Sequence, residues 1–196
     1  MSSRHLCSAV LGLLLACSAA SAKSAIGAAA PAFELKDQNG ATVTLAQFKG
    51  KTVVLEWAND GCPVWRGHHR PRKTTMVDLQ ARYAEKGVIW LAIDSTASHD
   101  AKRLKATAER FQIAYPILDD HAGHVGRAYG ARTTPHMFII DPSGKLAYDG
   151  AIDNRGQGDE PINYVDRALT EILAAKPVST PKTKPYGCGV KYGKRK

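Results

Sequence analysis

Cys62 is the residue of this sequence whose type and surroundings point most directly to chemistry. It stands in EWANDGCPVWRGHH, residues 56–69, just after the apolar run TVVL. A helix beginning at Pro63 would offer unpaired N–H groups and a partial positive charge to the sulfur, and both stabilise a thiolate. Proline suits a first helical turn because its missing N–H loses no hydrogen bond there. We therefore predict a nucleophilic thiolate at Cys62; the alternative is a structural half-cystine or an inert buried thiol.

The sulfur that would partner Cys62 is not where a two-cysteine redox motif places it. Trp65 stands three residues after Cys62, in the position of the second cysteine of Cys-x-x-Cys. Cys7 and Cys17 belong to the apolar N-terminal segment, and Cys188 belongs to the C-terminal tail. Two thiols in an oxidising compartment can form a lasting disulfide. If the N-terminal segment is removed, Cys188 is the remaining partner, and we expect it to resolve an intermediate formed at Cys62.

Residues 1–22 have the pattern of an export signal. Arg4 is followed by the apolar segment LCSAVLGLLLAC, and ASA at residues 20–22 predicts cleavage after Ala22. The competing interpretation is a lipoprotein signal, because LLAC places Cys17 behind two leucines and an alanine. Leu15 is bulky for that pattern, so we favour plain cleavage. We predict an exported, periplasmic protein, with anchoring through Cys17 as the alternative and with no transmembrane segment in the mature chain.

The positive charge is concentrated at the C-terminus. The net charge is +9, and residues 176–196 hold seven Lys/Arg and no acidic residue, so the rest of the chain is close to neutral. We interpret this segment as a solvated basic tail that carries Cys188 and lacks regular structure; the alternative is a patch for an anionic partner. No aromatic interleaving indicates nucleic-acid binding.

Strands and helices alternate between residues 23 and 175. Residues 32–36 and 41–45 predict a hairpin around Asn39-Gly40. Strands are expected at 52–58, 88–94 and 114–119, and a final strand pair at 136–141 and 145–150. Helices are expected at 68–87, 98–112 with Ser98 as cap, 124–130 and 160–175. This order predicts an α/β domain with a central mixed sheet flanked by helices and an N-terminal β-hairpin extension. Cys62 then lies at the carboxyl end of a strand, where ligand sites collect.

Three stretches resemble the thioredoxin superfamily, and within it the redoxin branch of the alkyl hydroperoxide reductase/thiol-specific antioxidant type. They are VVLEWANDGCP at 53–63, YGARTTPHMFIIDPSGKLAYDG at 129–150 and TKPYGCGVKY at 183–192. The resemblance covers roughly residues 31–192. It implies a thioredoxin-like fold, no cofactor, and protein or small-molecule thiols and disulfides as substrates, with peroxides as a further class.

The resemblance also assigns site residues. Pro135 would be a cis-proline opposite Cys62, and Thr134 would offer backbone groups to an incoming thiol or substrate chain. Pro63 and Trp65 would join the same substrate surface. Glu56 would be a buried acid that serves as general base for thiol exchange. From the residues alone, Glu56 could equally be an exposed glutamate at the end of its strand.

The same chain departs from the peroxiredoxin pattern. Asn59 stands where that signature has threonine or serine, and only Arg66 and Arg132 are candidates to steady a peroxidatic thiolate. The leading interpretation is therefore an exported thiol–disulfide oxidoreductase. A peroxidase, in which Cys62 becomes a sulfenic acid, is the runner-up. A non-enzymatic binding domain, in which a disulfide between Cys62 and Cys188 merely pins the tail, is the third.

Several histidines raise the question of a metal site. His68 and His69 are adjacent, so they would point to different faces of a helix and would not form an i, i+4 pair. His121, His124 and His136 raise the same question, and a copper-carrying relative would combine such a histidine with two cysteines close to each other. We expect no metal, and we interpret these histidines as surface or substrate-facing residues.

Overall fold

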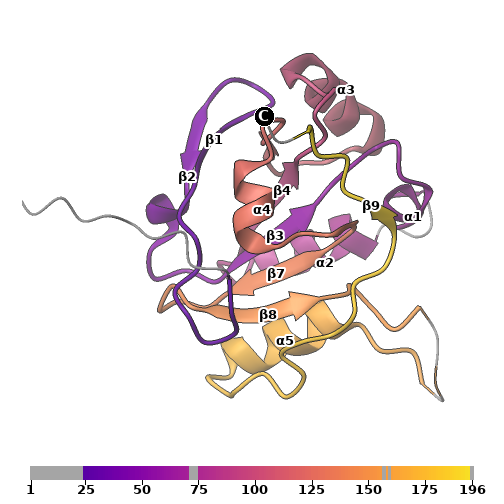
Figure 1. Cartoon of the computed structure of the whole chain (residues 1–196). Helices are drawn as coiled ribbons and strands as arrows, with labels where there is room; N and C mark the ends of the chain where they lie inside the picture. The colour runs from indigo at the N-terminus through magenta and orange to yellow at the C-terminus, as the bar shows by residue number, and fades with distance from the viewer. Residues whose placement is uncertain (1–23, 71–74, 156–157, 159, 195–196) are drawn as a thin grey trace, which may run out of the picture.

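The computed structural model describes residues 24–70, 75–155, 158 and 160–194. The predicted export signal, with Cys7 and Cys17, lies outside the described residues. The strands of the main sheet are β1 (Glu34–Asp37), β2 (Thr42–Thr44), β3 (Val53–Trp57), β4 (Ile89–Asp94), β5 (Ile117–Asp119), β7 (Met137–Ile140) and β8 (Leu146–Gly150). They are ordered β2-β1-β5-β4-β3-β7-β8 (Figure 1).

The sheet is mixed, as predicted. Strands β3, β4 and β5 run parallel to one another, whereas β1, β2, β7 and β8 pair antiparallel with their neighbours. The helices are α1 (Pro63–Gly67), α2 (Thr75–Ala84), α3 (Ala101–Phe111), α4 (His124–Tyr129) and α5 (Tyr164–Leu173). The expected α/β architecture, with a central sheet between helices, is confirmed.

Both faces of the central strand β3 are covered. Val53, Leu55 and Trp57 point to one face, where residues of α4 and of the N-terminal segment complete a core cluster. Val54 and, by the same alternation, Glu56 point to the other, which is covered by apolar residues of α1, α2, α3 and α5. Strands that are covered on both faces have nearly continuous apolar sequences. The sequence TVVLEWA of residues 52–58 fits this pattern.

The N-terminal hairpin is confirmed at β1 and β2. Gly40 has a φ of +85°, a conformation that glycine adopts without strain, and the Asp37 carboxylate accepts hydrogen bonds from the N–H groups of Asn39 and Ala41. The hairpin extends the main sheet through pairing of β1 with β5. The expected cap at Ser98 is wrong. Helix α3 starts later, with Asp100 as N-cap accepting a hydrogen bond from the N–H of Arg103 at 2.9 Å.

The C-terminal tail is docked on the domain instead of being solvated; apart from a short strand at Cys188–Gly189 and an isolated bridge at Lys182, its described residues lack regular structure, as predicted. After α5 it follows β8, where Lys182 bridges to Asp149, and then forms β9 (Cys188–Gly189) against β6 (Thr133–Thr134) (Figure 1). Farther on, Tyr192 donates from its hydroxyl to the carbonyl of Ala131 at 2.8 Å. Proline and glycine disfavour a helix here, but they leave the backbone extended and free to pair with an exposed strand edge. None of the helices among the described residues is long and apolar enough to cross a membrane.

Candidate active site

Cys62 lies at the N-terminus of α1, in the loop that follows β3. It is the N-cap residue, with an extended backbone, and Pro63 is the first helical residue, as predicted. Its side chain is buried, with 2% exposure. The thiol donates to the carbonyl oxygen of Thr134 at 3.0 Å, although the two residues are 72 positions apart. Strand β3 and the segment before β7 therefore bring Cys62 and Thr134 together.

The peptide bond between Thr134 and Pro135 is cis, which confirms the prediction. Thr134 and Pro135 are both buried, and Pro63 is exposed. The predicted substrate-contacting backbone of Thr134 is already engaged from two sides. Its carbonyl oxygen accepts a hydrogen bond from the Cys62 thiol, and Thr134 is the strand partner of Cys188 in the pairing of β6 with β9.

Cys188 lies beside Cys62, where the tail brings it. Both cysteines are free thiols in the structure, and each thiol influences the pKa of the other. Cys188 is partly exposed, whereas Cys62 is buried. The Thr134 hydroxyl donates to the carbonyl of Cys188 at 3.4 Å. The sequence places these cysteines 126 residues apart, and strand β9 brings Cys188 to Thr134, the residue whose carbonyl oxygen accepts from the Cys62 thiol.

The surroundings of the two thiols shift their pKa values in opposite directions. Burial tends to raise the pKa of Cys62, but hydrogen bonds from the Cys188 thiol, the Thr134 side chain and the backbone of Trp65 together lower it below its ordinary value. The same hydrogen bond to Cys62, together with burial, raises the pKa of Cys188. The surroundings thus favour ionisation of Cys62 over ionisation of Cys188.

Glu56 is buried, so the interpretation as an exposed strand-end residue is wrong. Its side chain is 0% exposed, and its oxygens accept hydrogen bonds from Trp65 Nε1 at 2.7 Å, Trp90 Nε1 at 2.9 Å and the Tyr115 hydroxyl at 3.0 Å. His69 Nε2 lies 3.4 Å from the carboxylate. Hydrogen bonds to this one carboxylate on β3 therefore join β3 to α1, to β4 and to the segment just before β5. Among the described residues, Glu56 has no direct hydrogen bond to Cys62.

Trp65 points into the core instead of toward a substrate. Its side chain is 0% exposed, and its ring stacks on His69 with centroids 3.9 Å apart and meets Phe111 edge-on. The backbone of Trp65 hydrogen-bonds to the Cys62 sulfur. The first turn of α1 directs the Trp65 side chain toward Glu56. Because this side chain has no exposed surface, the predicted substrate contact through it is wrong.

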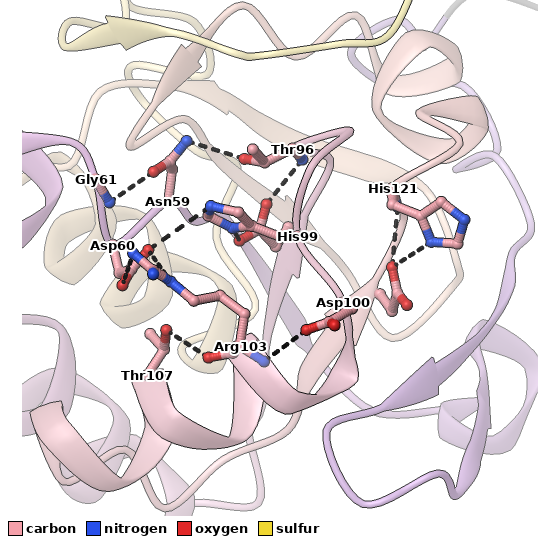
Figure 2. A network of polar contacts seen from close by, with 11 residues as sticks. Asn59, Asp60, Gly61, Thr96, His99, Asp100, Arg103, Thr107 and His121 are labelled. Carbon is pink, nitrogen blue, oxygen red and sulfur yellow. Dashed lines mark hydrogen bonds and ion pairs between the residues drawn. The ribbon is translucent and has the colours of Figure 1, made fainter.

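Asn59 shapes the loop that carries Cys62. Its side-chain oxygen accepts a hydrogen bond from the N–H of Gly61 at 2.7 Å, and its side-chain nitrogen donates to the Thr96 hydroxyl at 2.9 Å. The Asn59 carbonyl also accepts from the N–H of Cys62. Asn59 is therefore a turn residue, and its polar side chain is turned to the loop after β4 (Figure 2).

Asp60, next to it, anchors the same loop to α3 (Figure 2). Its buried carboxylate forms an ion pair with Arg103 at 2.8 Å and lies 3.9 Å from His99. His99 in turn contacts Asp94 at 2.8 Å, and the hydrogen bond to Asp94 raises the pKa of His99 in spite of burial. Sequence analysis missed this network because its members are spread over more than 40 residues.

His136 is a second group that sequence analysis placed wrongly, as a surface or substrate-facing residue. It is 1% exposed, follows Pro135 directly, and contacts Asp149 through Nε2 at 2.8 Å. Its Nδ1 accepts from the backbone N–H of Arg132 at 3.2 Å, which assigns the proton to Nε2. Asp149 also forms an ion pair with Lys182 of the tail at 3.2 Å. The segment around the cis peptide and the tail thus meet at one carboxylate.

The remaining histidines and arginines have other surroundings. His68 and His69 are both buried, and His68 Nε2 lies 3.1 Å from the Tyr186 hydroxyl of the tail. Within the part of the chain that the structure describes, neither the Arg66 nor the Arg132 guanidinium hydrogen-bonds to the Cys62 sulfur; the backbone N–H of Arg66 donates to the Cys62 carbonyl at 2.9 Å, within the first turn of α1. Arg132 acts there through its backbone, whose carbonyl accepts from the N–H of Val190 in the tail.

Comparison with known proteins gives consistent matches. The sequence pattern of the AhpC/TSA family matches residues 26–149. The thiol-disulfide oxidoreductase ResA of Bacillus thuringiensis subsp. konkukian is 31% identical over 124 residues, which make up 63% of this chain and 68% of that protein. The chloroplastic peroxiredoxin Q of Triticum aestivum is 30% identical over 135 residues, covering 62% of this chain and 57% of that protein.

One solved structure extends the likeness into the tail. The crystal structure of an uncharacterized conserved protein from Geobacillus kaustophilus superposes with a TM-score of 0.78 at 27% identity, covering 88% of this chain and 94% of that one. The family pattern stops at Asp149, before the tail. The described fold and the arrangement of Cys62 beside a cis-proline are those of a thioredoxin-like domain.

Proposed function

The chain belongs to the AhpC/TSA family, and we propose that it is an exported thiol–disulfide oxidoreductase in which Cys62 is the nucleophile and Cys188 the resolving thiol. One observation carries this proposal: strand β9 pairs Cys188 with Thr134, and the carbonyl oxygen of the same Thr134 accepts from the Cys62 thiol at 3.0 Å. Both cysteines are thereby held at one residue. The lowered pKa of Cys62 and the raised pKa of Cys188 suit an attacking and a resolving thiol respectively.

The reaction follows from this geometry. The Cys62 thiolate attacks one sulfur of a substrate disulfide, forms a mixed disulfide and releases the other sulfur as a thiolate, which takes up a proton. Cys188 then loses its proton and attacks the Cys62 sulfur, which releases the second substrate thiol. The products are two substrate thiols and a Cys62–Cys188 disulfide, so two electrons pass from the protein to the substrate. Two external thiols, or one dithiol, reverse the sequence: they reduce the protein disulfide to both protein thiols and are themselves oxidised to a disulfide.

Other residues have supporting roles in this proposal. Thr134 holds the sulfur through its carbonyl, Pro135 shapes that segment, and exposed Pro63 borders the approach to Cys62. Glu56 remains the proposed general base, although its position supports proton exchange only by way of its hydrogen-bonded partners. Trp65 takes a positioning role: it links the first turn of α1, which stabilises the Cys62 thiolate, to the Glu56 carboxylate.

Peroxide reduction is the second candidate function, and the match to a peroxiredoxin Q favours it. In that case the Cys62 thiolate would attack a peroxide oxygen to give a sulfenic acid and water or an alcohol, and Cys188 would displace water to form the same disulfide. The position of Asn59 argues against the usual peroxiredoxin site, because its side chain is committed to Gly61 and Thr96.

A purely structural disulfide is the weakest candidate. The tail is held by contacts other than a disulfide. Lys182 pairs with Asp149, Tyr186 contacts Asp153 and His68, and Tyr192 contacts Ala131. These contacts hold the tail in place while both thiols are free, so a disulfide is not needed to pin it.

Single-turnover chemistry tests the proposed function. The reduced protein is mixed with glutathione disulfide, quenched with acid and analysed by mass spectrometry. We expect the parent to accumulate an internal disulfide that joins Cys62 and Cys188. Cys188→Ser should stop at a glutathione adduct on Cys62, and Cys62→Ser should form neither product. Formation of the same products by Cys188→Ser and by the parent would exclude Cys188 as the resolving thiol. A parallel reaction with hydrogen peroxide distinguishes peroxide reduction, the second candidate function, from disulfide exchange.

Export is the other part of the proposal, and it rests on the sequence pattern of residues 1–22. Expression in a bacterium with a periplasm should give a processed protein that starts at Lys23. Mass spectrometry of the purified protein reads this terminus directly. A lipid-modified Cys17 at the new terminus would establish the lipoprotein alternative, and an unprocessed cytoplasmic chain would contradict export.

A further inference from the structure

Strand β9 occupies the strand edge next to Cys62. Thr133 pairs with Gly189, and Thr134 pairs with Cys188, in antiparallel register. The N–H of Val190 donates to the Arg132 carbonyl at 3.1 Å and continues the pairing by one residue. An extended polypeptide that adds itself to a sheet edge needs these same backbone groups. The tail therefore makes the contacts that a polypeptide substrate would have to make at β6.

Gly187 is what allows the tail to come this close. Its φ of +131° lies in a region that residues with a side chain rarely adopt. A Cβ at this position would stand 2.1 Å from the Thr134 carbonyl oxygen and 2.8 Å from its carbonyl carbon. Both of these are backbone atoms, so they cannot rotate away. Gly189, on the other side of Cys188, has only the Arg132 carbonyl oxygen nearby, at 4.0 Å from a built Cβ.

The tail is anchored on both sides of β9. Upstream of β9, Lys182 pairs with Asp149, and the hydroxyl of Tyr186 contacts Asp153 and His68. Downstream, Tyr192 bonds to Ala131, and Arg127 donates to the carbonyl of Gly193 at 2.7 Å. Anchors at both ends hold the strand against β6, so a competing chain would have to detach several contacts at once.

A cavity large enough for a small molecule lies beside the start of α1. It measures about 640 Å³, and its lining among the described residues includes Pro63, Val64 and Tyr186 but neither cysteine. This volume lies in the range of small-molecule sites. Pro63 follows Cys62 directly, and the partly exposed Cys188 comes two residues after Tyr186. A compact disulfide in this cavity would therefore lie next to residues that flank the two cysteines, whereas the neighbouring strand edge is filled by β9.

We propose that β9 is a built-in occupant of the β6 edge that sets substrate class: with the tail docked, Cys62 accepts low-molecular-weight disulfides and excludes disulfides within extended polypeptides. Gly187 is the specificity-determining residue, because it permits the close approach of the tail to Thr134. The inference rests on the proposed function, since it presupposes that Cys62 attacks a disulfide. The first step is the same for both substrates: a bond forms between the Cys62 sulfur and one substrate sulfur, and the other substrate sulfur leaves as a thiolate.

The test compares two disulfides in a background that stops after this step. All proteins carry Cys188→Ser, so each Cys62 forms one stable mixed disulfide. Glutathione disulfide is the small probe, and insulin is the polypeptide probe. Mass spectrometry follows adduct formation and gives a rate constant for each. The ratio of the two rate constants is the readout, because changes in the ionisation of Cys62 affect both and cancel.

Without a further substitution, the ratio should strongly favour glutathione disulfide. Gly187→Ala should raise the insulin-to-glutathione ratio at least tenfold, whereas the matched control Gly189→Ala should leave it within twofold. Tyr192→Ala loosens the tail without adding an atom beside Thr134, and it should shift the ratio in the same direction as Gly187→Ala. Hydrogen exchange of residues 182–192 identifies the variants in which the tail is loosened.

Two results would overturn the inference in distinguishable ways. If the tail is loosened in Gly187→Ala or Tyr192→Ala and the ratio stays that of Gly189→Ala, the occupied edge does not set substrate class, and the proposed function stands. If Cys62 reacts with neither probe in any variant that is folded by circular dichroism, the proposed function fails, and the inference fails with it.

Discussion

Thr134 and Cys188 face each other across β6 and β9, and the carbonyl of the same Thr134 receives the Cys62 thiol at 3.0 Å. One residue therefore contacts both cysteines, through its backbone on one side and its strand pairing on the other. This relationship makes the reactivity of Cys62 depend on the tail, since the tail supplies the Cys188 thiol. The predictions below test that dependence and the buried groups around it.

Removing the Cys188 thiol should raise the pKa of Cys62. Cys188 supplies the largest of the hydrogen bonds that lower this pKa, and burial, which raises it, remains in the variant. We expect the rate of alkylation by iodoacetamide to show a higher apparent pKa in Cys188→Ala than in the parent, whose apparent pKa should lie below that of an ordinary cysteine. Cys188→Ser keeps a hydroxyl donor and should fall between the two. An unchanged pKa in Cys188→Ala would separate the ionisation of Cys62 from the tail.

Oxidation should stabilise the folded protein. A disulfide between Cys62 and Cys188 closes a loop of more than 100 residues, which in the chain-entropy model stabilises the fold by about 4–5 kcal/mol. Because the tail is already docked when both thiols are free, little native rearrangement opposes this effect. Urea unfolding with and without reductant measures it. Cys188→Ser should unfold at the same urea concentration in both conditions, and a reductant effect that persisted there would point to another cause.

Glu56→Gln should destabilise the protein. The carboxylate accepts from three donors, whereas a glutamine amide would turn one N–H₂ group toward donors. Leaving buried donors unsatisfied costs about 1–3 kcal/mol, and we expect a loss of this size in the free energy of unfolding. Urea unfolding measures that loss.

The same variant tests the role of Glu56 in proton transfer. If Glu56 is the general base of thiol exchange, Glu56→Gln should also change the pH dependence of glutathione-adduct formation. Trp65→Phe is the matched control, because it removes one hydrogen bond to Glu56 and keeps the carboxylate. A pH profile that is the same in all three proteins would leave Glu56 a purely structural role.

His136 should make the protein less stable in mild acid. Burial lowers the pKa of His136 in the folded state and outweighs the opposing effect of Asp149. The unfolded chain then binds more protons than the folded one below the ordinary histidine pKa of about 6.5. The stability contributed by neutral His136 is therefore fully present above pH ~6.5 and is lost as the pH falls toward the lowered folded-state value.

A substitution isolates this contribution. His136→Asn should flatten the dependence of the unfolding free energy between pH 7 and 5, measured by urea unfolding at several pH values. His121→Asn is the control, since His121 contacts Asp119 at the same 2.8 Å but is exposed. The loss of stability between pH 7 and 5 is assigned to His136 only if His136→Asn and His121→Asn differ in that pH range. Identical slopes in His136→Asn and the parent would assign the acid sensitivity to other groups.

Much of the site was predictable because its parts are local in sequence. Cys62 followed by Pro63 indicates a helix start, and apolar TVVL before it indicates a buried strand, so the placement of the thiol follows from about ten residues. The cis peptide before Pro135 was expected from the resemblance of the segment around it. These features depend on short-range sterics and backbone hydrogen bonding, which neighbouring residues control.

Glu56 and Trp65 show where local patterns lose their predictive power. Alternation along β3 assigns Glu56 to a face, but both faces of this strand are covered, so either phase buries the side chain. Whether that burial is tolerated depends on four residues from three separate segments of the chain: Trp65 and His69, Trp90, and Tyr115. Likewise, the Trp65 side chain points inward because the Glu56 carboxylate accepts a hydrogen bond from its indole N–H.

By itself, the sequence determined the α/β alternation, the hairpin turn at Gly40 and the thiol at a helix start. Only the tertiary structure decided that the tail docks, that Cys188 reaches Cys62, and that His136 meets Asp149 and Lys182. The physical reason is that a basic, glycine- and proline-rich segment has no preferred structure of its own. It acquires one from the free edge of β6 and from the fit of Gly187 against Thr134, and these surfaces exist only once distant parts of the chain have come together.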